Sequence, residues 1–200
     1  MNTANKITFL RVWLSPVFFV LFFLPVWTSF PVYVAIPLMV VTFAAIELSD
    51  LFDGKVARRL NQVSDFGKAL DPFGDSISRI TYFFCFTVSG YMPAWIFILI
   101  LYRDMSVSFI RQLAAQKGTV MPSRMSGKIK AWVYAVAGIV GTLYHFGVLL
   151  GAGTFVPFLS LTSLGMFIWV FAIIMNTLFF LASATAVWTL ADYLLALRKN

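Results

Sequence analysis

Residues 50–75 read DLFDGKVARRLNQVSDFGKALDPFGD. The segment holds four carboxylates in two close pairs, Asp50 with Asp53 and Asp71 with Asp75. On a helix, residues three or four positions apart share a face, with Cβ atoms about 5–6 Å apart. A charged side chain in the middle of a bilayer costs about 2.5–3.5 kcal/mol on insertion scales. The four aspartates are therefore expected to line a polar cleft, where clustered carboxylates favour hard cations.

The sequence on both sides of this segment is typical of an integral membrane protein. The chain has 200 residues, of which 60% are hydrophobic and 12% are charged, and its mean hydropathy is +0.88. Six apolar runs approach the roughly 20 residues that cross a bilayer. They lie at about 10–29, 32–58, 68–90, 93–115, 128–150 and 164–196. The sequence therefore predicts an all-α protein of six transmembrane helices, forming a single catalytic domain over residues 1–200.

The basic residues indicate the orientation of these helices. All 15 lie near the two termini or around the second and fourth connections, and the other three connections have none. Because Lys and Arg collect on the cytosolic side, both termini and the aspartate segment are expected in the cytosol. The same rule accounts for the net charge of +7, so nucleic-acid binding is not expected. The single Cys85 and single His145 exclude an internal disulfide and an ordinary zinc site.

The polar stripes on the second and third predicted helices can face each other. One stripe lies within an arc of about 140° on the second helix, at 100° per residue, and contains Asp50, Asp53, Gly54, Ala57 and Arg58. The other contains Gly67, Asp71, Asp75 and Arg79. The turn between them is short, so the helices are antiparallel neighbours. Four facing carboxylates fit two divalent cations about 3.5–4 Å apart, and all-oxygen ligands favour Mg²⁺ or Mn²⁺. The small residues admit either a ligand or close helix packing.

The segment fits the pattern D-x2-D-G-x2-A-R-x8-G-x3-D-x3-D and resembles the signature of the CDP-alcohol phosphotransferase family. The eight fixed positions are Asp50, Asp53, Gly54, Ala57, Arg58, Gly67, Asp71 and Asp75. The resemblance implies the six-helix membrane fold of that family, usually a homodimer. It also implies transfer of a substituted phosphoryl group from a CDP-linked donor to an alcohol, with release of CMP.

Roles for individual residues follow from this resemblance. It implies that Asp50, Asp53, Asp71 and Asp75 bind two divalent cations, and that Asp75 also accepts the proton of the acceptor hydroxyl. The donor side of the site is expected to contain Asp53, Gly54, Ala57, Arg58 and Gly67, together with Thr8.

The acceptor is indicated by basic residues around the fourth connection. Arg103, Arg111, Lys117, Arg124, Lys128 and Lys130 surround it. They can bind an acceptor that carries phosphate, or they can serve only to fix the topology. Arg103 and Arg111 are expected inside the fourth helix, where a charge that only fixes the topology is energetically unfavourable.

Flanking sequences resemble the bacterial phosphatidylglycerophosphate synthases of the same family. They are Asn5-Lys6-Ile7-Thr8 with Arg11, and Gly127-Lys128-Ile129-Lys130. The resemblance implies CDP-diacylglycerol as donor and glycerol 3-phosphate as acceptor, at the cytosolic face of a bacterial inner membrane. The phosphate of the acceptor is then expected on Arg11, Arg103, Arg111, Lys128 and Lys130. Gly74, Ser76 and Asp104 depart from that pattern, which has Ala, Lys and Glu there.

Two alternatives remain open. The same chemistry can use inositol phosphate or another alcohol as acceptor. Intramembrane carboxylates also mark the ion paths of cation transporters, which place acids near mid-membrane on several helices. Here six of the eight acids lie within residues 47–75, at a predicted cytosolic edge, which favours the enzyme.

Overall fold

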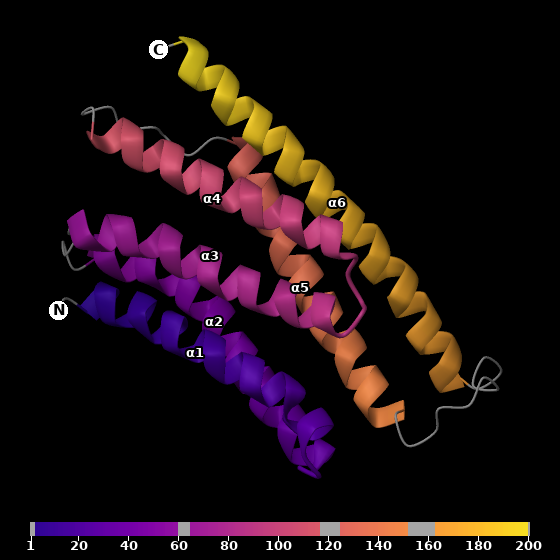
Figure 1. The fold of residues 1–200 in the computed structure, drawn as a ribbon. Coiled ribbons are helices and arrows are strands. Elements are labelled where there is room, and N and C mark those ends of the chain that lie inside the picture. The colour runs from indigo at the N-terminus through magenta and orange to yellow at the C-terminus, as the bar shows by residue number, and fades with distance from the viewer. Residues whose placement is uncertain (1–2, 60–64, 117–124, 152–162, 200) are drawn as a thin grey trace. The chain divides into compact units, whose positions relative to one another are not determined.

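The computed structural model describes residues 3–59, 65–116, 125–151 and 163–199, and within these ranges the chain is helical without strands (Figure 1). The six helices are α1 (Thr3–Trp27), α2 (Val32–Arg59), α3 (Asp65–Val88), α4 (Ala94–Gln116), α5 (Met125–Gly151) and α6 (Ser163–Lys199). The all-α prediction is confirmed, and each of the six predicted apolar runs lies largely within one helix.

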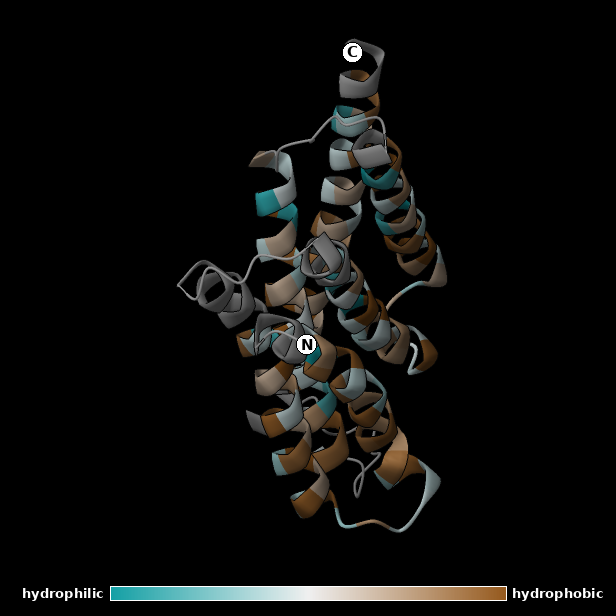
Figure 2. Ribbon diagram, turned by 90° about the vertical axis from the view of Figure 1, so that its left-hand side faces the viewer, coloured by the Kyte–Doolittle hydropathy of each residue, from teal (hydrophilic) through white to brown (hydrophobic). Residues whose placement is uncertain are grey.

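Among the described residues, four helices contain segments that are long and apolar enough to cross a membrane. The segments are Thr8–Trp27, Val32–Ser49, Met125–Gly151 and Trp169–Leu195. α3 contains Asp75 and Arg79, and α4 contains Arg103, Asp104 and Arg111. Brown, hydrophobic residues predominate on the described helices in Figure 2. A helix suits such sequences because it satisfies its own backbone hydrogen bonds where no water is available.

The described chain forms two compact units, residues 1–85 and 86–200. In the first unit α1 packs along α2, and aromatic residues join the three helices. The Phe18 ring lies 5.8 Å from the Phe43 ring, which lies 5.8 Å from the Tyr82 ring. All three side chains are buried. These contacts connect α1 to α2 and α2 to α3, and they support the helix ends that carry the predicted site.

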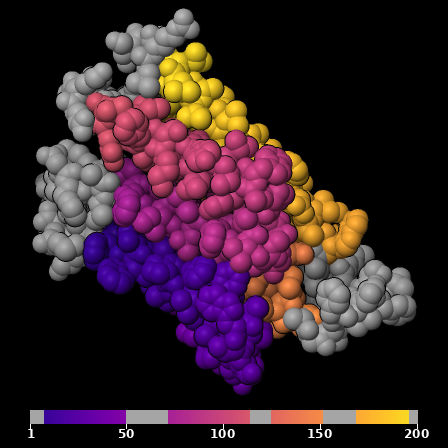
Figure 3. Space-filling model, in the orientation of Figure 1, coloured from indigo at the N-terminus to yellow at the C-terminus, as the bar shows by residue number. Residues whose placement is uncertain are grey.

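In the second unit α6 packs against both α4 and α5. Figure 3 shows the yellow surface of α6 directly beside the pink surface of α4. Phe86, at the end of α3, is fully buried with its ring 5.9 Å from that of Phe179 on α6. A Cβ atom added at Gly141 on α5 would lie 2.6 Å from the Phe86 ring. The glycine therefore allows α5 to approach this ring closely.

The turn after α3 requires a glycine and is connected to α5. Gly90 has a φ of 76°, which favours glycine, and the Tyr91 amide donates to the carbonyl of Phe86. The Tyr91 hydroxyl lies 3.0 Å from Nδ1 of His145. Burial, followed by the neighbouring Tyr144, raises the pKa of Tyr91 to about 12. The phenol therefore stays protonated at neutral pH, and its hydroxyl can donate a hydrogen bond to Nδ1 of His145.

Candidate functional site

The acidic segment lies at the end of α2 and in the first half of α3. The backbones of Asp50 and Asp53 are in α2, and those of Asp71 and Asp75 are in α3. The helical spacing of both pairs is thus confirmed for the backbone. For several predicted site residues the structure describes only the helical backbone: Asp50, Asp53, Gly54, Ala57, Arg58, Gly67 and Asp71. Their metal and donor assignments stay predictions.

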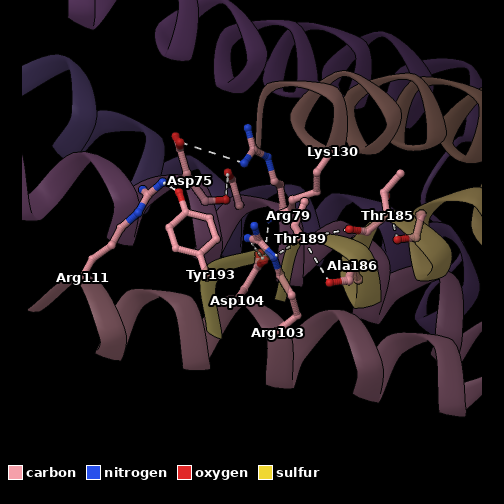
Figure 4. Close-up of polar contacts among 12 residues, drawn as sticks. Asp75, Arg79, Arg103, Asp104, Arg111, Lys130, Thr185, Ala186, Thr189 and Tyr193 are labelled. Atoms are coloured by element: carbon pink, nitrogen blue, oxygen red, sulfur yellow. Dashed lines mark hydrogen bonds and ion pairs between the residues drawn. The ribbon is translucent and has the colours of Figure 1, made fainter. Parts of the chain in front are cut away.

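Asp75 is the member of this group whose side chain is described. Its carboxylate is 29% exposed and accepts a hydrogen bond from the guanidinium of Arg11 on α1, whose side chain is 1% exposed. Arg79, one turn further along α3, places NH1 3.9 Å from Oδ2 of Asp75, as Figure 4 shows. Two cations therefore stabilise the charge of Asp75 and limit its rotation. Arg11 was predicted to bind the acceptor phosphate, and that role stays a prediction beside this observed contact.

Glu47 adds a second carboxylate to this group. It is half-buried on α2, one turn before Asp50, and interacts electrostatically with Arg79, Arg11 and Asp75. The first unit thus contains a charge network of two arginines and two carboxylates next to the predicted metal site. Glu47 was not among the predicted site residues, although its spacing of three residues from Asp50 places it on the same side of α2.

Thr8, predicted on the donor side, is fully buried where α1 meets α3. A Cβ atom added at Gly74 would lie 3.1 Å from Cγ2 of Thr8. This contact is tighter than most, so the glycine gives Thr8 room beside Asp75. Gly74 is one of the departures from the expected pattern, and the contact with Thr8 provides a physical reason for it.

In the second unit, two predicted acceptor residues share one buried carboxylate. Asp104 accepts from Arg103 NH1 at 3.0 Å and from Lys130 Nζ at 2.5 Å (Figure 4). Arg103, Asp104 and Lys130 are 7%, 3% and 4% exposed. Arg103 also donates from Nε to the Thr189 hydroxyl at 2.8 Å. Buried ions persist only when paired and hydrogen-bonded, and Asp104 supplies that pairing from α4.

Arg111 lies two turns further along α4 and contacts α6. Its NH2 group donates to the Tyr193 hydroxyl at 2.5 Å, and its guanidinium carbon lies 5.2 Å from the centre of the Tyr193 ring. Lys130 lies 4.4 Å from the centre of the Tyr134 ring. Aromatic faces attract cations without neutralising them. Lys128, the remaining predicted acceptor residue of this group, is exposed.

We define the basic cluster as Arg103, Asp104, Arg111 and Lys130. Arg103 and Lys130 share the Asp104 carboxylate, and Arg111 contacts Tyr193, so the group contains three cations and one carboxylate. Arg103 and Lys130 are buried, and Arg111 is half-buried. Such an excess of cations is costly in an apolar environment and is relieved by a bound anion. An arginine fork is well suited to phosphate oxygens. The arrangement can therefore bind a phosphorylated ligand.

Sequence reasoning missed the residues of α6 that contact this cluster. Thr189 and Tyr193 hold the two arginines, and Asp192 accepts a hydrogen bond from Ser126 of α5 at 2.7 Å. The available signal was their helical spacing, because polar groups recur within one turn near the end of an apolar helix. That spacing does not reveal which neighbouring helix they face.

Comparison with protein families matches residues 1–187 to the family described as CDP-alcohol phosphatidyltransferase. The match includes the whole aspartate segment and most of α6. It ends before Thr189, Asp192 and Tyr193.

Individual relatives are enzymes named CDP-diacylglycerol–glycerol-3-phosphate 3-phosphatidyltransferase. The protein of Bacillus subtilis (strain 168) is 34% identical over 142 residues, which cover 68% of this chain and 74% of that protein. The protein of Treponema pallidum (strain Nichols) is 36% identical over 104 residues, 52% of this chain and 48% of the relative, so the match spans about half of that protein. The protein of Shigella flexneri serotype 5b (strain 8401) is 26% identical over 205 residues, 100% of this chain and 96% of the relative.

Proposed function

The chain belongs to the CDP-alcohol phosphatidyltransferase family, and we propose that it transfers the phosphatidyl group of CDP-diacylglycerol to glycerol 3-phosphate. The products are phosphatidylglycerophosphate and CMP. The observation that carries this proposal is the complete aspartate motif within a chain whose relatives, at 34–36% identity, have names that state this reaction. The three cations of the basic cluster, of which Arg103 and Lys130 are buried, support an acceptor that carries phosphate.

The acidic segment has a donor set suited to two divalent cations. Its four carboxylates provide only oxygen ligands, which favour Mg²⁺ or Mn²⁺. We assign Asp50, Asp53, Asp71 and Asp75 to this role, and the bound cations would supply charge neutralisation for the diphosphate of the donor. The cytidine diphosphate would lie along Asp53, Gly54, Ala57, Arg58 and Gly67, with Thr8 supporting this side from α1.

We assign Asp75 the role of proton acceptor. The acceptor hydroxyl oxygen forms a bond to the phosphorus that carries the diacylglycerol, and the bond from that phosphorus to the CMP oxygen breaks. The proton of the hydroxyl passes to the Asp75 carboxylate, and CMP leaves with the electron pair of the broken bond. Arg11 and Arg79 hold this carboxylate from two sides, so its main contribution is the orientation of the attacking hydroxyl.

We assign the acceptor phosphate to Arg103, Arg111 and Lys130, together with the exposed Lys128. The resemblance to phosphatidylglycerophosphate synthases adds Arg11 to this set. Burial supports this proposal, because a charge that only fixes topology needs no buried partner such as Asp104. Inositol phosphate carries the same charged group and is the second candidate acceptor. Cation transport is disfavoured, since six of the eight acids lie within residues 47–75 instead of along several helices.

We further propose that all six helices cross a bacterial inner membrane, with both termini and the active site in the cytosol, and that the enzyme is a homodimer. The exposed apolar residues of α1, α5 and α6 would then contact lipid. This arrangement gives a lipid-linked donor lateral access to the site and a soluble acceptor access from the cytosol.

The test is an assay of CMP release by the purified protein with CDP-diacylglycerol and separate acceptors. Release is expected with glycerol 3-phosphate and not with glycerol, because glycerol lacks the phosphate. EDTA should abolish release, and added Mg²⁺ or Mn²⁺ should restore it. Release with inositol phosphate but not with glycerol 3-phosphate would show that the acceptor is wrong, and cation flux without any CMP release would show that the enzyme class is wrong.

A further inference from the structure

The geometry points to Thr189 and Tyr193 of α6 as positioning residues for the phosphate of the acceptor. Each hydroxyl holds one arginine of the basic cluster from a helix that is not in the predicted site. This inference rests on the proposed function, and it assigns a role to a segment beyond residue 187, where the family match ends.

Thr189 presents a lone pair to Arg103 in a fixed direction. The side chain is fully buried, and its hydroxyl donates to a carbonyl within α6, either Thr185 at 2.8 Å or Ala186 at 3.0 Å (Figure 4). A hydroxyl has a single hydrogen, so the oxygen facing Arg103 Nε acts as an acceptor. This contact and the contact with Asp104 use two of the five N–H groups of Arg103, and they fix the plane of the guanidinium.

Tyr193 holds Arg111 one helical turn further along α6. The side chain is 1% exposed, and its hydroxyl accepts from Arg111 NH2 at 2.5 Å. A Cβ atom added at Gly127 of α5 would lie 4.0 Å from this hydroxyl, so the end of the Tyr193 side chain lies between α4 and α5. Asp192, beside it, accepts from Ser126 of α5 and adds a second contact between α6 and α5.

The partners of Arg103 and Arg111 differ in what they do: Asp104 neutralises positive charge, whereas Thr189 and Tyr193 orient the guanidinium groups. Asp104 removes one positive charge from the cluster, whereas the hydroxyls of Thr189 and Tyr193 are neutral. Neutral acceptors restrict the rotation of both arginines but leave their charge for a ligand. Because an arginine side chain loses considerable rotamer freedom on binding, arginines that are already fixed bind phosphate oxygens at a lower entropic cost.

The test compares variants that remove one hydroxyl each, Thr189→Val and Tyr193→Phe, with matched controls. Thr177→Val removes an exposed hydroxyl whose hydrogen bond stays within α6, to the Ile173 carbonyl. Tyr102→Phe removes the hydroxyl of a side chain that is 64% exposed on α4. Steady-state assays would give kcat and the KM of each substrate, and isothermal titration would give the Kd of glycerol 3-phosphate. Thermal melting would report folding.

We expect each α6 variant to raise the KM and Kd of glycerol 3-phosphate about threefold to tenfold, the range for one hydrogen bond. The KM of CDP-diacylglycerol should stay at the wild-type value, the melting temperature should fall by no more than the loss of one buried hydrogen bond implies, and Thr189→Ser should restore acceptor binding. Both controls should match the wild type. Unchanged acceptor binding, or an equal change in the KM of both substrates, would overturn the positioning role. If the wild-type protein binds glycerol 3-phosphate but releases no CMP, the proposed function is refuted. Weaker binding of glycerol 3-phosphate by the two α6 variants would in that case still support the positioning role.

Discussion

Asp75 has two proposed roles, as a ligand of the divalent cations and as the acceptor of the hydroxyl proton. It is partly exposed, yet it is held by Arg11 from α1 and by Arg79 from its own helix. The network that includes Glu47 lies next to the predicted metal ligands.

Replacing the base should remove turnover while leaving the fold intact. Asp75→Asn keeps the size of the side chain but cannot accept the proton and is a weaker cation ligand, so CMP release should fall at least about 100-fold. Initial rates at saturating substrate would measure this, and circular dichroism would confirm the helical content. Asp65→Asn, at the start of α3 and outside the proposed site, is the matched control. Activity above a tenth of the wild type in Asp75→Asn would contradict the role as base.

The contact between Arg11 and Asp75 should also be measurable as stability. Arg11→Met removes a buried charge-assisted hydrogen bond, which is worth about 1.5–3 kcal/mol, and should lower the melting temperature. Arg11→Lys keeps the charge but not the fork, and should lie between the variant and the wild type. Equal melting temperatures for all three proteins would show that the contact does not stabilise the first unit.

At the scale of single residues, the sequence predicts the chemical role of a residue better than it predicts which residues are in contact. The spacing of Asp71 and Asp75 was sufficient to place both on one helix, and the positions of Arg103 and Arg111 within α4 are confirmed. The pairing of both cations Arg103 and Lys130 with Asp104 was not predictable. It depends on which face of α4 meets α5 and α6. The sequence does not reveal that face, because each of these helices has hydrophobic residues on most of its sides.

At the scale of helices, the six apolar runs predicted the elements to within a few residues at most ends. The second run, for example, was expected at 32–58, and α2 is Val32–Arg59. Hydrophobicity and length determine such helices because lipid permits few other backbone structures. Within the described residues, α4 is not among the four segments that length and composition mark as spans, because Arg103, Asp104 and Arg111 lie within its length.

Close packing between α5 and the end of α3 gives a prediction at this scale. Gly141→Ala would bring a methyl group to 2.6 Å from the buried Phe86 ring, and overpacking of this kind costs about 1–3 kcal/mol. The melting temperature should fall. Gly127→Ala, where the nearest atom would lie 4.0 Å away, should not lower it, because alanine favours the helix. A stable Gly141→Ala protein would show that the Phe86 ring moves aside easily.

At the scale of the whole molecule, the charge pattern predicts the topology, and labelling can test it. The native Cys85 is buried, so an introduced cysteine can be detected with little background. Ser29→Cys follows α1 and Gln112→Cys lies near the end of α4, and both positions are exposed. In intact cells, a membrane-impermeant maleimide should label the cysteine at position 29 and not the one at position 112. The reverse pattern would place the proposed site on the outer face.

The sequence predicted a single catalytic domain over residues 1–200, which stays a prediction, and it did not reveal the two compact units, residues 1–85 and 86–200. Periodicity marks where helices occur, but it gives no partner for a helix that is apolar on most of its faces. Family membership, in contrast, was accessible from eight residues, since the metal and nucleotide chemistry requires fixed side chains at fixed spacing.

The central claim is the coupled formation of CMP and a phosphorylated lipid, and the most direct test measures both products in one reaction. Purified protein would be incubated with Mg²⁺, CDP-diacylglycerol and glycerol 3-phosphate, and CMP and lipid would be quantified by mass spectrometry. The account predicts equimolar CMP and phosphatidylglycerophosphate, with neither product formed when glycerol 3-phosphate is omitted. CMP formed together with phosphatidic acid, or no CMP under any of these conditions, would contradict it.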